Sequence, residues 1–309
     1  MKTFTKDSLS GKVQGIMGSP VRKEVSLLHF IRLLYKYTPR IFRIIQYRCT
    51  TKNASYQCAR AIDLVPLKEY IEYMPFYEHI DTLDVDNRYR KDICTTFSNI
   101  KYKPVKRFFS DYAHFLRCGD AMYVPEKPDD SAGLYDPIQD VYKFNYKIEL
   151  NNELGSCNTH FHEMAHQIDH HLGKSIGACS WSFANCLRES VQRDYNFVLK
   201  QTKEAKRLST EEAQKEISTE LKKHPEEANI VSDVFGGVTL NQVHGVYVHR
   251  KDYWKENIHV RVAQEVFAEI TADIASGNVS HIEFSKKYLL CTIEKYYQMM
   301  KGLYDENNK

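Results

Sequence analysis

Apolar positions recur with helical spacing between Thr159 and Gly173, a stretch that reads T-H-F-H-E-M-A-H-Q-I-D-H-H-L-G. At about 100° per residue, the apolar side chains fall on one arc: Phe161, Met164, Ala165, Ile168 and Leu172. His162 and His166 lie on an adjoining stripe, because residues four apart stand one above the other on a helix. The pattern predicts an amphipathic helix that buries one face and presents two imidazoles along another.

A second helical pattern runs from about His259 to Ser276 and stops before Gly277. Its apolar face comprises Val262, Ala263, Val266, Phe267, Ile270 and Ile274. Glu265, Glu269 and Asp273 follow one another at spacings of four, where like charges repel by roughly 0.2–0.5 kcal/mol per pair. A metal ion and a ligating histidine would offset this repulsion. The acidic row therefore predicts that this helix contributes a metal ligand.

Apolar and polar residues alternate from Val141 to Leu150, which predicts a β-strand. Lysines on its outward face would discourage unwanted sheet pairing. An open strand edge can also bind an extended peptide by adding it as a further strand. We therefore expect an edge strand beside the helix predicted between Thr159 and Gly173, with Tyr142, Phe144 and Tyr146 as substrate-binding side chains.

Taken together, these elements predict an α+β fold with a small mixed sheet and two helices that meet around a metal ion. Residues 1–90 form a predicted basic, mainly helical region, with helices between Val25 and Tyr47. Residues 91–309 form the predicted domain that carries the site. Within it, the charged helical pattern at about 187–225 predicts an inserted helical hairpin, and Gly236-Gly237 predicts a turn.

The composition is that of a soluble globular chain of 309 residues with a net charge of +3. None of its eight cysteines forms a C-x-x-C pair, and a chain of this size does not need a disulfide framework, so we expect reduced thiols in a cytosolic setting. The first ten residues lack the apolar segment of a secretory signal. No apolar run approaches the roughly 20 residues of a spanning helix, so no membrane span is expected.

The helix predicted between Thr159 and Gly173 contains an H-E-x-x-H motif from His162 to His166. Its two imidazoles can bind one zinc ion, and Glu163 beside them can act as a general base. A catalytic zinc site takes three protein ligands and keeps one position open for water. We assign Glu265 as the third ligand. A metzincin would need a third histidine at the position of Leu172, so that class is excluded.

Further side chains are expected to support this chemistry. Glu269, one turn beyond the third ligand, and Asp169 on the first helix are predicted to accept hydrogen bonds from the ligating imidazoles. Tyr253 and His249 are candidates to stabilise the developing oxyanion. The pattern does not rank these two residues.

H-E-M-A-H-Q-I-D followed far downstream by E-V-F-A-E resembles the lethal-factor-like branch of the zincins. Together with S-A-G-L-Y-D-P, V-S-D-V-F-G-G-V-T and V-H-R-K-D-Y-W, these segments are also similar to the C-terminal metallopeptidase-like region of minor head proteins from tailed phages and prophages. The resemblance covers about residues 103–274. It implies a zincin fold, zinc ligation by His162, His166 and Glu265, and Glu163 as the base. The chain departs from the family pattern at Ala165 and before His249, where the family has glycine.

These features predict a zinc-dependent peptidase in which Glu163 activates a zinc-bound water, associated with a phage or prophage. Its partners would be a peptide or protein substrate, including a phage head or host protein. Its location would be the cytoplasm of a bacterial host or the virion, with no signal peptide. Two alternatives keep the zinc: a non-catalytic accessory head protein with the metal as a structural staple, and a delivered protease toxin.

Basic residues dominate the first 60 positions, which carry twelve lysines and arginines against only Asp7 and Glu24. Such a charge could contact nucleic acid or another anionic partner. No nucleic-acid motif accompanies it, so we favour a docked helical pair with a solvated basic face. Steep salt dependence of DNA retention would support the nucleic-acid alternative.

Overall fold

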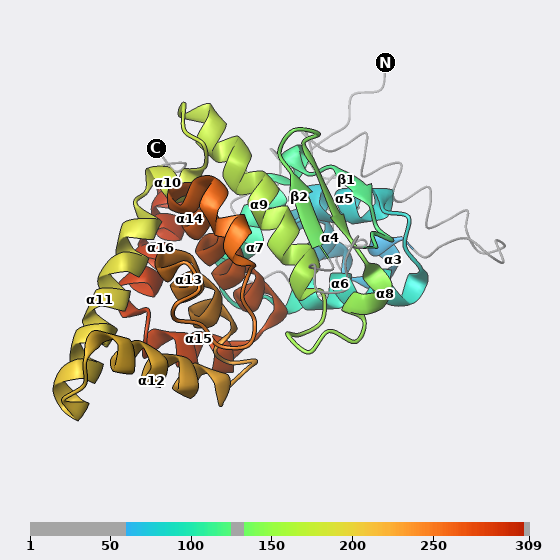
Figure 1. The fold of residues 1–309 in the computed structure, drawn as a ribbon. Helices are drawn as coiled ribbons and strands as arrows, with labels where there is room; N and C mark the ends of the chain where they lie inside the picture. The colour runs from blue at the N-terminus through green and yellow to red at the C-terminus, as the bar shows by residue number, and fades with distance from the viewer. Residues whose placement is uncertain (1–59, 125–132, 306–309) are drawn as a thin grey trace, which may run out of the picture. The chain divides into compact units, whose positions relative to one another are not determined.

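A computed structural model describes residues 60–124 and 133–305, which belong to a compact unit that begins at Cys58. The basic helices predicted between Val25 and Tyr47 lie outside the described residues. Residues 60–90 are mainly helical and belong to the same compact unit as the rest, so this unit begins before the predicted boundary near residue 90. The described chain is mostly helical with one small mixed sheet, an α+β arrangement (Figure 1).

The helices and strands have the following bounds: α3 Ala61–Leu64, α4 Leu67–Glu72, α5 Met74–Thr82, α6 Asn87–Asn99, α7 Lys103–Asp111, a short 3-10 helix Ala113–Phe115, β1 Cys118–Asp120, β2 Gly133–Asp136, β3 Val141–Phe144, α8 Tyr146–Glu149, α9 Asn158–Ser175, α10 Trp181–Ala184, α11 Leu187–Lys206, α12 Thr210–Lys222, α13 Asn229–Thr239, α14 Lys251–Ser276, α15 Val279–Lys286 and α16 Leu290–Asp305.

The sheet corrects the expected edge strand. Its order is β1-β3-β2, so β3 is the central strand, parallel to β1 and antiparallel to β2. The strand predicted from Val141 to Leu150 ends at Phe144 and is followed by α8. The turn comes from Asn145, whose side-chain oxygen accepts from the backbone N–H groups of Lys147 and Ile148 and so caps α8. Alternation continues along the sequence, but this cap ends the strand.

Helix α9 lies at the centre of the described unit (Figure 1). It packs against β2 and β3 of the sheet and against α10 and α14, so it joins the sheet to the later helices. The predicted helix is confirmed, with bounds close to the expected ones. Its N-cap residue, Cys157, provides no side-chain cap. The buried carboxylate of Glu149 instead accepts from the backbone N–H of His160, which satisfies one of the open donors of the first turn.

Helix α14 is longer than predicted, because it begins at Lys251. Asn257 has non-helical backbone angles and marks a kink between the first turns and the main helix. Gly236 and Gly237 lie inside α13, so the predicted turn at these glycines is wrong. A Cβ on Gly237 would come within 2.6 Å of Val262 Cγ2, which indicates that the glycine allows α13 to approach α14 closely.

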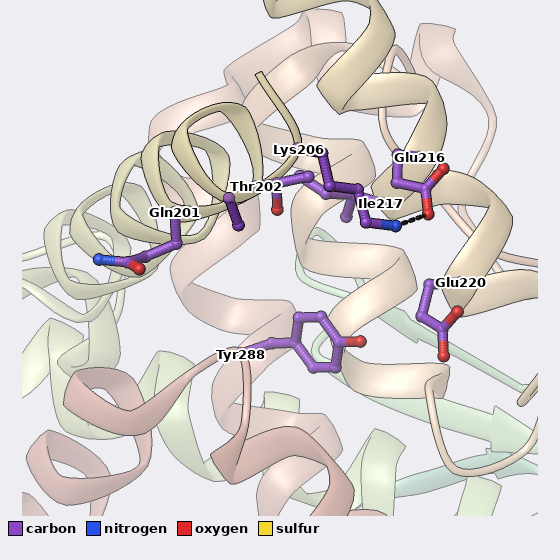
Figure 2. Close-up of a pocket in the computed structure, with 8 residues that line it drawn as sticks. Gln201, Thr202, Lys206, Glu216, Ile217, Glu220 and Tyr288 are labelled. Carbon is purple, nitrogen blue, oxygen red and sulfur yellow. Dashed lines mark hydrogen bonds and ion pairs between the residues drawn. The ribbon is translucent and has the colours of Figure 1, made fainter. Parts of the chain in front are cut away.

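The predicted helical hairpin at 187–225 is formed by α11 and α12. Ser209 and Glu212 form a capping box at the start of α12. A cavity of about 340 Å³ lies between these helices and Tyr288, beside the ion pair of Lys206 and Glu216 (Figure 2). Its lining contains none of the predicted site residues. Among the described helices, none is both long and apolar enough to cross a membrane.

Candidate metal centre

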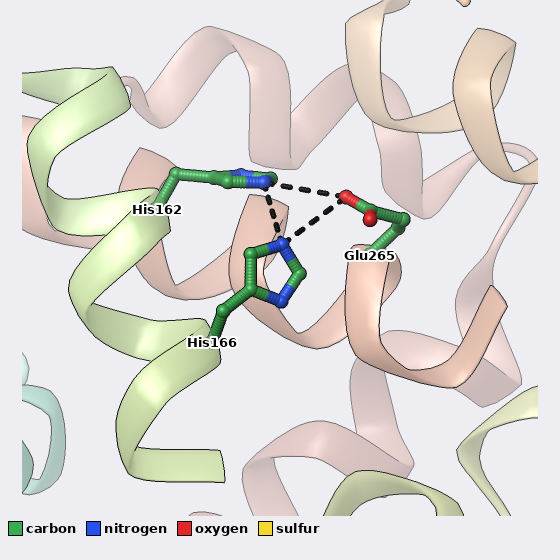
Figure 3. Close-up of side chains that lie close together, drawn as sticks. All are labelled: His162, His166 and Glu265. Carbon is green, nitrogen blue, oxygen red and sulfur yellow. Dashed lines mark hydrogen bonds and ion pairs between the residues drawn. The ribbon is translucent and has the colours of Figure 1, made fainter. Parts of the chain in front are cut away.

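Three side chains from α9 and α14 converge on one point (Figure 3). The Nε2 atoms of His162 and His166 lie 2.9 Å apart, and Oε2 of Glu265 lies 3.2 and 3.3 Å from them. Zinc bonds of about 2.0–2.2 Å at tetrahedral angles separate neighbouring ligand atoms by about 3.3–3.6 Å. The spacing of the three atoms is therefore close to that of a zinc site.

The electrostatics of the cluster also fit a cation. Glu265 is almost fully buried, and its Oε2 accepts no well-aligned hydrogen bond although two imidazole nitrogens face it. A buried carboxylate oxygen without a hydrogen bond is costly. Burial raises the pKa of Glu265, but the neighbouring histidines outweigh it and hold that pKa well below its usual range. The carboxylate is thus anionic and directed at two nitrogen ligands, which is the donor set of a divalent metal.

The position of these ligands follows from the antiparallel packing of α9 on α14. Asn158 donates to Asp273 at one end of the contact, with a Nδ2 to Oδ1 distance of 3.0 Å. Two turns along, His166 faces Glu265. Because α9 advances as α14 returns, residues four apart on one helix meet residues four apart on the other. The histidines of the H-E-x-x-H motif on α9 therefore face the acidic row on α14.

One side of the cluster remains open. The side chains of His162 and His166 are 13 % and 11 % exposed, whereas that of Glu265 is 2 % exposed. Within residues 60–124 and 133–305, no fourth histidine, cysteine or acidic side chain lies within 4.8 Å of all three ligand atoms, although Asp233 and His249 form a second group of this kind with Glu265. Catalytic zinc sites use three protein ligands, whereas structural zinc sites use four.

Glu163 is buried beside the cluster and lies under the sheet. Only 4 % of its surface is exposed. Burial raises the pKa of its carboxyl group, and His162 and His166 oppose that rise. A raised pKa suits a group that must take a proton and return it. Its carboxylate approaches the backbone of β2 at Gly133, where an added Cβ would lie 2.7 Å from Oε1.

Tyr253 contacts the carboxylate of Glu265 directly. Its hydroxyl donates to Oε1 of Glu265, the oxygen that does not face the histidines. The guanidinium of Arg261 lies 4.0 Å from the centre of the tyrosine ring. Burial, with Glu265 beside it, raises the pKa of Tyr253 well above 10, so the phenol keeps the proton that it donates. The structure therefore places this side chain on the third predicted ligand.

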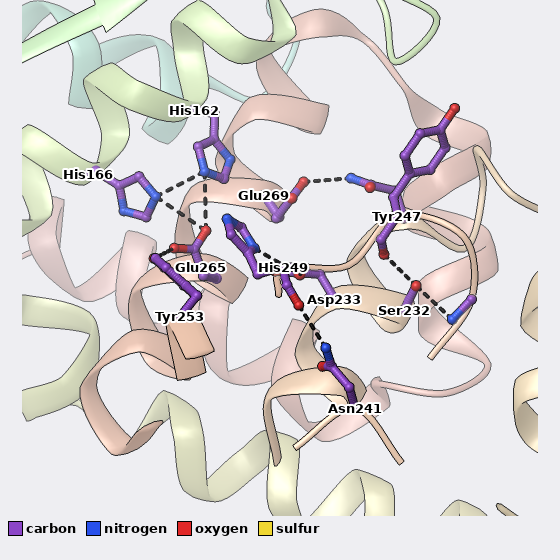
Figure 4. Close-up of polar contacts among 12 residues, drawn as sticks. His162, His166, Ser232, Asp233, Asn241, Tyr247, His249, Tyr253, Glu265 and Glu269 are labelled. Carbon is purple, nitrogen blue, oxygen red and sulfur yellow. Dashed lines mark hydrogen bonds and ion pairs between the residues drawn. The ribbon is translucent and has the colours of Figure 1, made fainter. Parts of the chain in front are cut away.

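His249 also reaches the cluster, held by a residue to which the sequence pattern gave no role (Figure 4). Oδ1 of Asp233 accepts from the backbone N–H of His249 at 2.7 Å and pairs with its Nδ1 at 2.9 Å. The imidazole stacks on Tyr253, with ring centres 4.2 Å apart. Although burial lowers the pKa of His249, Asp233 and Glu265 raise it to about 9. The ring is held in place through its Nδ1 atom.

Asp233 lies in V-S-D-V-F-G-G-V-T, and only the fold brings this segment to the site. It is on α13, whereas His249 is in the loop before α14. Ser232, its neighbour, also holds that loop, because its hydroxyl accepts from the N–H of Gly245 at 2.7 Å and donates to the carbonyl of Tyr247. The signal available in the sequence was a Ser232-Asp233 pair inside the otherwise apolar run from Ile230 to Phe235. The partner of Asp233 could not be read from the sequence.

Glu269 and Asp169, which were expected to accept hydrogen bonds from the ligating imidazoles, lie in different surroundings. Glu269 is buried one turn from Glu265 and accepts from the side chain of Asn229 at 2.8 Å. Burial raises its pKa to about 8. The carboxylate of Asp169 accepts from the backbone N–H and the hydroxyl of Ser182, both at 2.7 Å, which fixes α10 beside α9. Burial raises the pKa of Asp169 to about 6.

The structure contradicts the substrate-binding role expected for Tyr142 and Phe144. Both side chains have no exposed surface and lie in the core against α9. The Tyr142 hydroxyl pairs with Nε2 of His79 at 2.6 Å and Nε2 of His160 at 3.1 Å. Tyr146 is half-buried on α8, 5.7 Å from the ring of Tyr89. The strand beside Glu163 is β2, not β3.

Comparisons with protein-family models, with curated proteins and with solved structures found no match for this chain. The arrangement of His162, His166, Glu265 and their neighbours is therefore the basis on which a function is assigned.

Proposed function

We propose that this chain is a zinc-dependent peptidase of the zincin type. The observation that carries the proposal is the convergence of His162, His166 and Glu265 within 3.3 Å of one another, with Glu163 beside them and no fourth ligand in the described residues. Held by His162, His166 and Glu265, zinc would supply Lewis-acid chemistry, since it lowers the pKa of water toward about 7 and polarises a carbonyl group.

The side chains around the ligands divide the remaining chemistry among them. Glu163 takes a proton from the attacking water and delivers it to the leaving amine. His249 uses Nδ1 to bind Asp233, which leaves Nε2 to donate to the developing oxyanion. Tyr253 donates to the outer oxygen of Glu265 and fixes the orientation of that carboxylate. This division ranks two residues that sequence reasoning could not separate.

The substrate-binding edge is reassigned to β2. Among the described strands, β2 has β3 as its one neighbour, and it lies over Glu163. An extended peptide that adds to its outer edge would form backbone hydrogen bonds there and lie across α9. Leu134 is 42 % exposed on this strand and would contact such a peptide. The proposal thus keeps substrate binding by strand addition and changes the strand.

A structural zinc staple is the alternative that this geometry disfavours. Such a site would use four protein ligands. The exposed edges of the two histidines instead leave the set of three accessible from one side. Failure of the zinc-loaded protein to cleave any member of a diverse peptide library would favour the staple.

The test compares two variants in the metal centre with wild type. Glu163→Gln should keep about one zinc per chain, measured by mass spectrometry of metal content, and lower kcat by at least about 100-fold, because proton transfer is lost. His162→Ala should lose the metal. Glu211→Gln, an exposed glutamate on α12, is the control for the change of charge. Undiminished cleavage by Glu163→Gln would refute the mechanism.

A further inference from the structure

The contact between β2 and the general base assigns a role to Gly133, the glycine of S-A-G-L-Y-D-P. It is the first residue of β2 and is buried against α9. A Cβ at this position would lie 2.7 Å from Oε1 and 2.8 Å from Cγ of Glu163, and 2.4 Å from Cγ2 of Thr159. All three distances are shorter than real carbon contacts, so any side chain here forces something to move.

Hydrogen bonds hold β2 against α9 and oppose movement of the strand away from the helix. In the turn after β2, the backbone carbonyl of Asp140 accepts a hydrogen bond from the side-chain amide of Gln167 at 2.7 Å. The carboxylate of Asp140 pairs with Nε2 of His171 at 2.9 Å. The hydroxyl of Tyr135, two residues after Gly133, donates to the same aspartate at 3.1 Å. These contacts set the height of β2 above α9.

The two side chains that would meet a Cβ differ in their freedom to move. Thr159 is β-branched and restricted in χ1 on a helix. Its hydroxyl also accepts from Asn152 at 3.2 Å. Glu163 has three side-chain torsions, and its carboxylate is the far end of a flexible chain. A crowded strand would therefore displace the carboxylate of Glu163 first.

We propose that Gly133 is a positioning residue: its missing side chain lets the edge strand come down on Glu163 and fixes the carboxylate on the side of the metal ligands. The role rests on the proposed function, because it concerns the base of that reaction. It also accounts for a sequence motif that the metal ligands and the oxyanion donor leave unexplained. The strand that would receive the substrate is thereby also the strand that orients the base.

The test is Gly133→Ala in the full chain. A base displaced by about 1 Å should lower kcat by about 100-fold. KM should stay within about threefold and zinc affinity should stay at the wild-type value, because the strand edge and the three ligands are unchanged. A crystal structure of the variant should show the Glu163 carboxylate moved from its wild-type position.

Two further variants separate this role from simple packing. Gly119→Ala places a Cβ 2.9 Å from Cγ2 of Val141, on the opposite edge of the same sheet. It should lower the melting temperature without changing kcat. Thr159→Ser combined with Gly133→Ala removes the Cγ2 contact and keeps the hydroxyl, so it should leave kcat low. Recovery of kcat in this double variant would overturn the proposal, as would a Gly133→Ala enzyme with wild-type kcat.

The proposed function has a separate outcome. If wild type binds zinc and cleaves no peptide, the peptidase proposal fails. If wild type cleaves and Gly133→Ala cleaves equally well with an unmoved carboxylate, only the role of Gly133 fails.

Discussion

Tyr253 and His249 at the candidate centre differ in whether a polar atom remains available to donate a hydrogen bond to a substrate. Tyr253 has one polar atom, and its hydroxyl is engaged by Oε1 of Glu265. His249 has two ring nitrogens, of which Nδ1 is engaged by Asp233. The imidazole can therefore hold its own position and still donate from Nε2, which the phenol can do only by leaving the ligand carboxylate.

This difference predicts opposite phenotypes for the two residues. Tyr253→Phe removes the hydrogen bond to the ligand carboxylate and should weaken zinc binding by about 10–100-fold, with kcat of the zinc-saturated enzyme nearly unchanged. His249→Gln should keep zinc and lower kcat by about 100-fold. Competition with a chromophoric chelator gives the affinities, and assays at saturating zinc give kcat. A phenylalanine variant with full zinc affinity and low kcat would instead make Tyr253 the oxyanion donor.

Pairs of elements carry the next level of organisation, and the contact of α9 with α14 is the central one. Asn158 and Asp273 hold one end of it, and His166 and Glu265 meet two turns away. Asp273 is fully buried and also accepts from Asn278 at 2.8 Å. The polar pairs along this contact define how far one helix can slide against the other.

The buried pair at the end of this contact should matter for stability. Asn158→Ala removes one donor to Asp273 and should lower the free energy of unfolding by about 1–3 kcal/mol, because a buried acceptor loses a hydrogen bond. Urea denaturation of the metal-free protein measures this change. Asn196→Ala, at an exposed position on α11, is the control and should change the free energy by less than about 0.5 kcal/mol. Equal losses in the two variants would contradict a special role for the pair.

The same scale explains what the sequence could predict. Helices α9 and α14 were predicted because helical periodicity and motif spacing are local properties, and His162 to His166 lie within about one turn. The end of β3 was not predicted, since Asn145 could either continue the strand or cap a helix. The location of β2 over Glu163 depends on sheet order, and the pairing of Asp233 with His249 depends on how α13 packs. Neither is encoded in a short window.

Over the whole described unit, α9 separates two polar regions. One region contains charged side chains, and the side chains of the other are neutral. On the α14 side, α9 faces the titratable side chains of the candidate metal centre. On the side of the sheet, it faces a buried network of neutral rings, in which Tyr142 and Tyr89 pair with the imidazole of His160, and Tyr142 pairs also with His79. Burial lowers the pKa of His79 to about 4 and that of His160 well below 6.5. Folding therefore favours the uncharged form of both rings.

This preference predicts how stability depends on pH. An unfolded histidine takes up a proton below about pH 6.5, whereas folded His79 does so only near pH 4. The stability that depends on its neutral form is thus fully present above about pH 6.5 and falls as the pH drops toward 4, by up to about 1.4 kcal/mol per pH unit. His79→Gln keeps a neutral hydrogen-bonding group beside Tyr142 and should remove this part of the slope.

Urea denaturation in EDTA at pH 7.5, 6.5, 5.5 and 4.5 measures the slope. The chelator removes metal from wild type and variant alike, so protonation of zinc ligands contributes equally to both and cancels in the difference. His259→Gln, at an exposed position on α14, is the control for the change of residue type and should keep the wild-type slope. If His79→Gln lost stability as steeply as wild type between pH 6.5 and 4.5, the buried network would not be what makes this fold sensitive to acid.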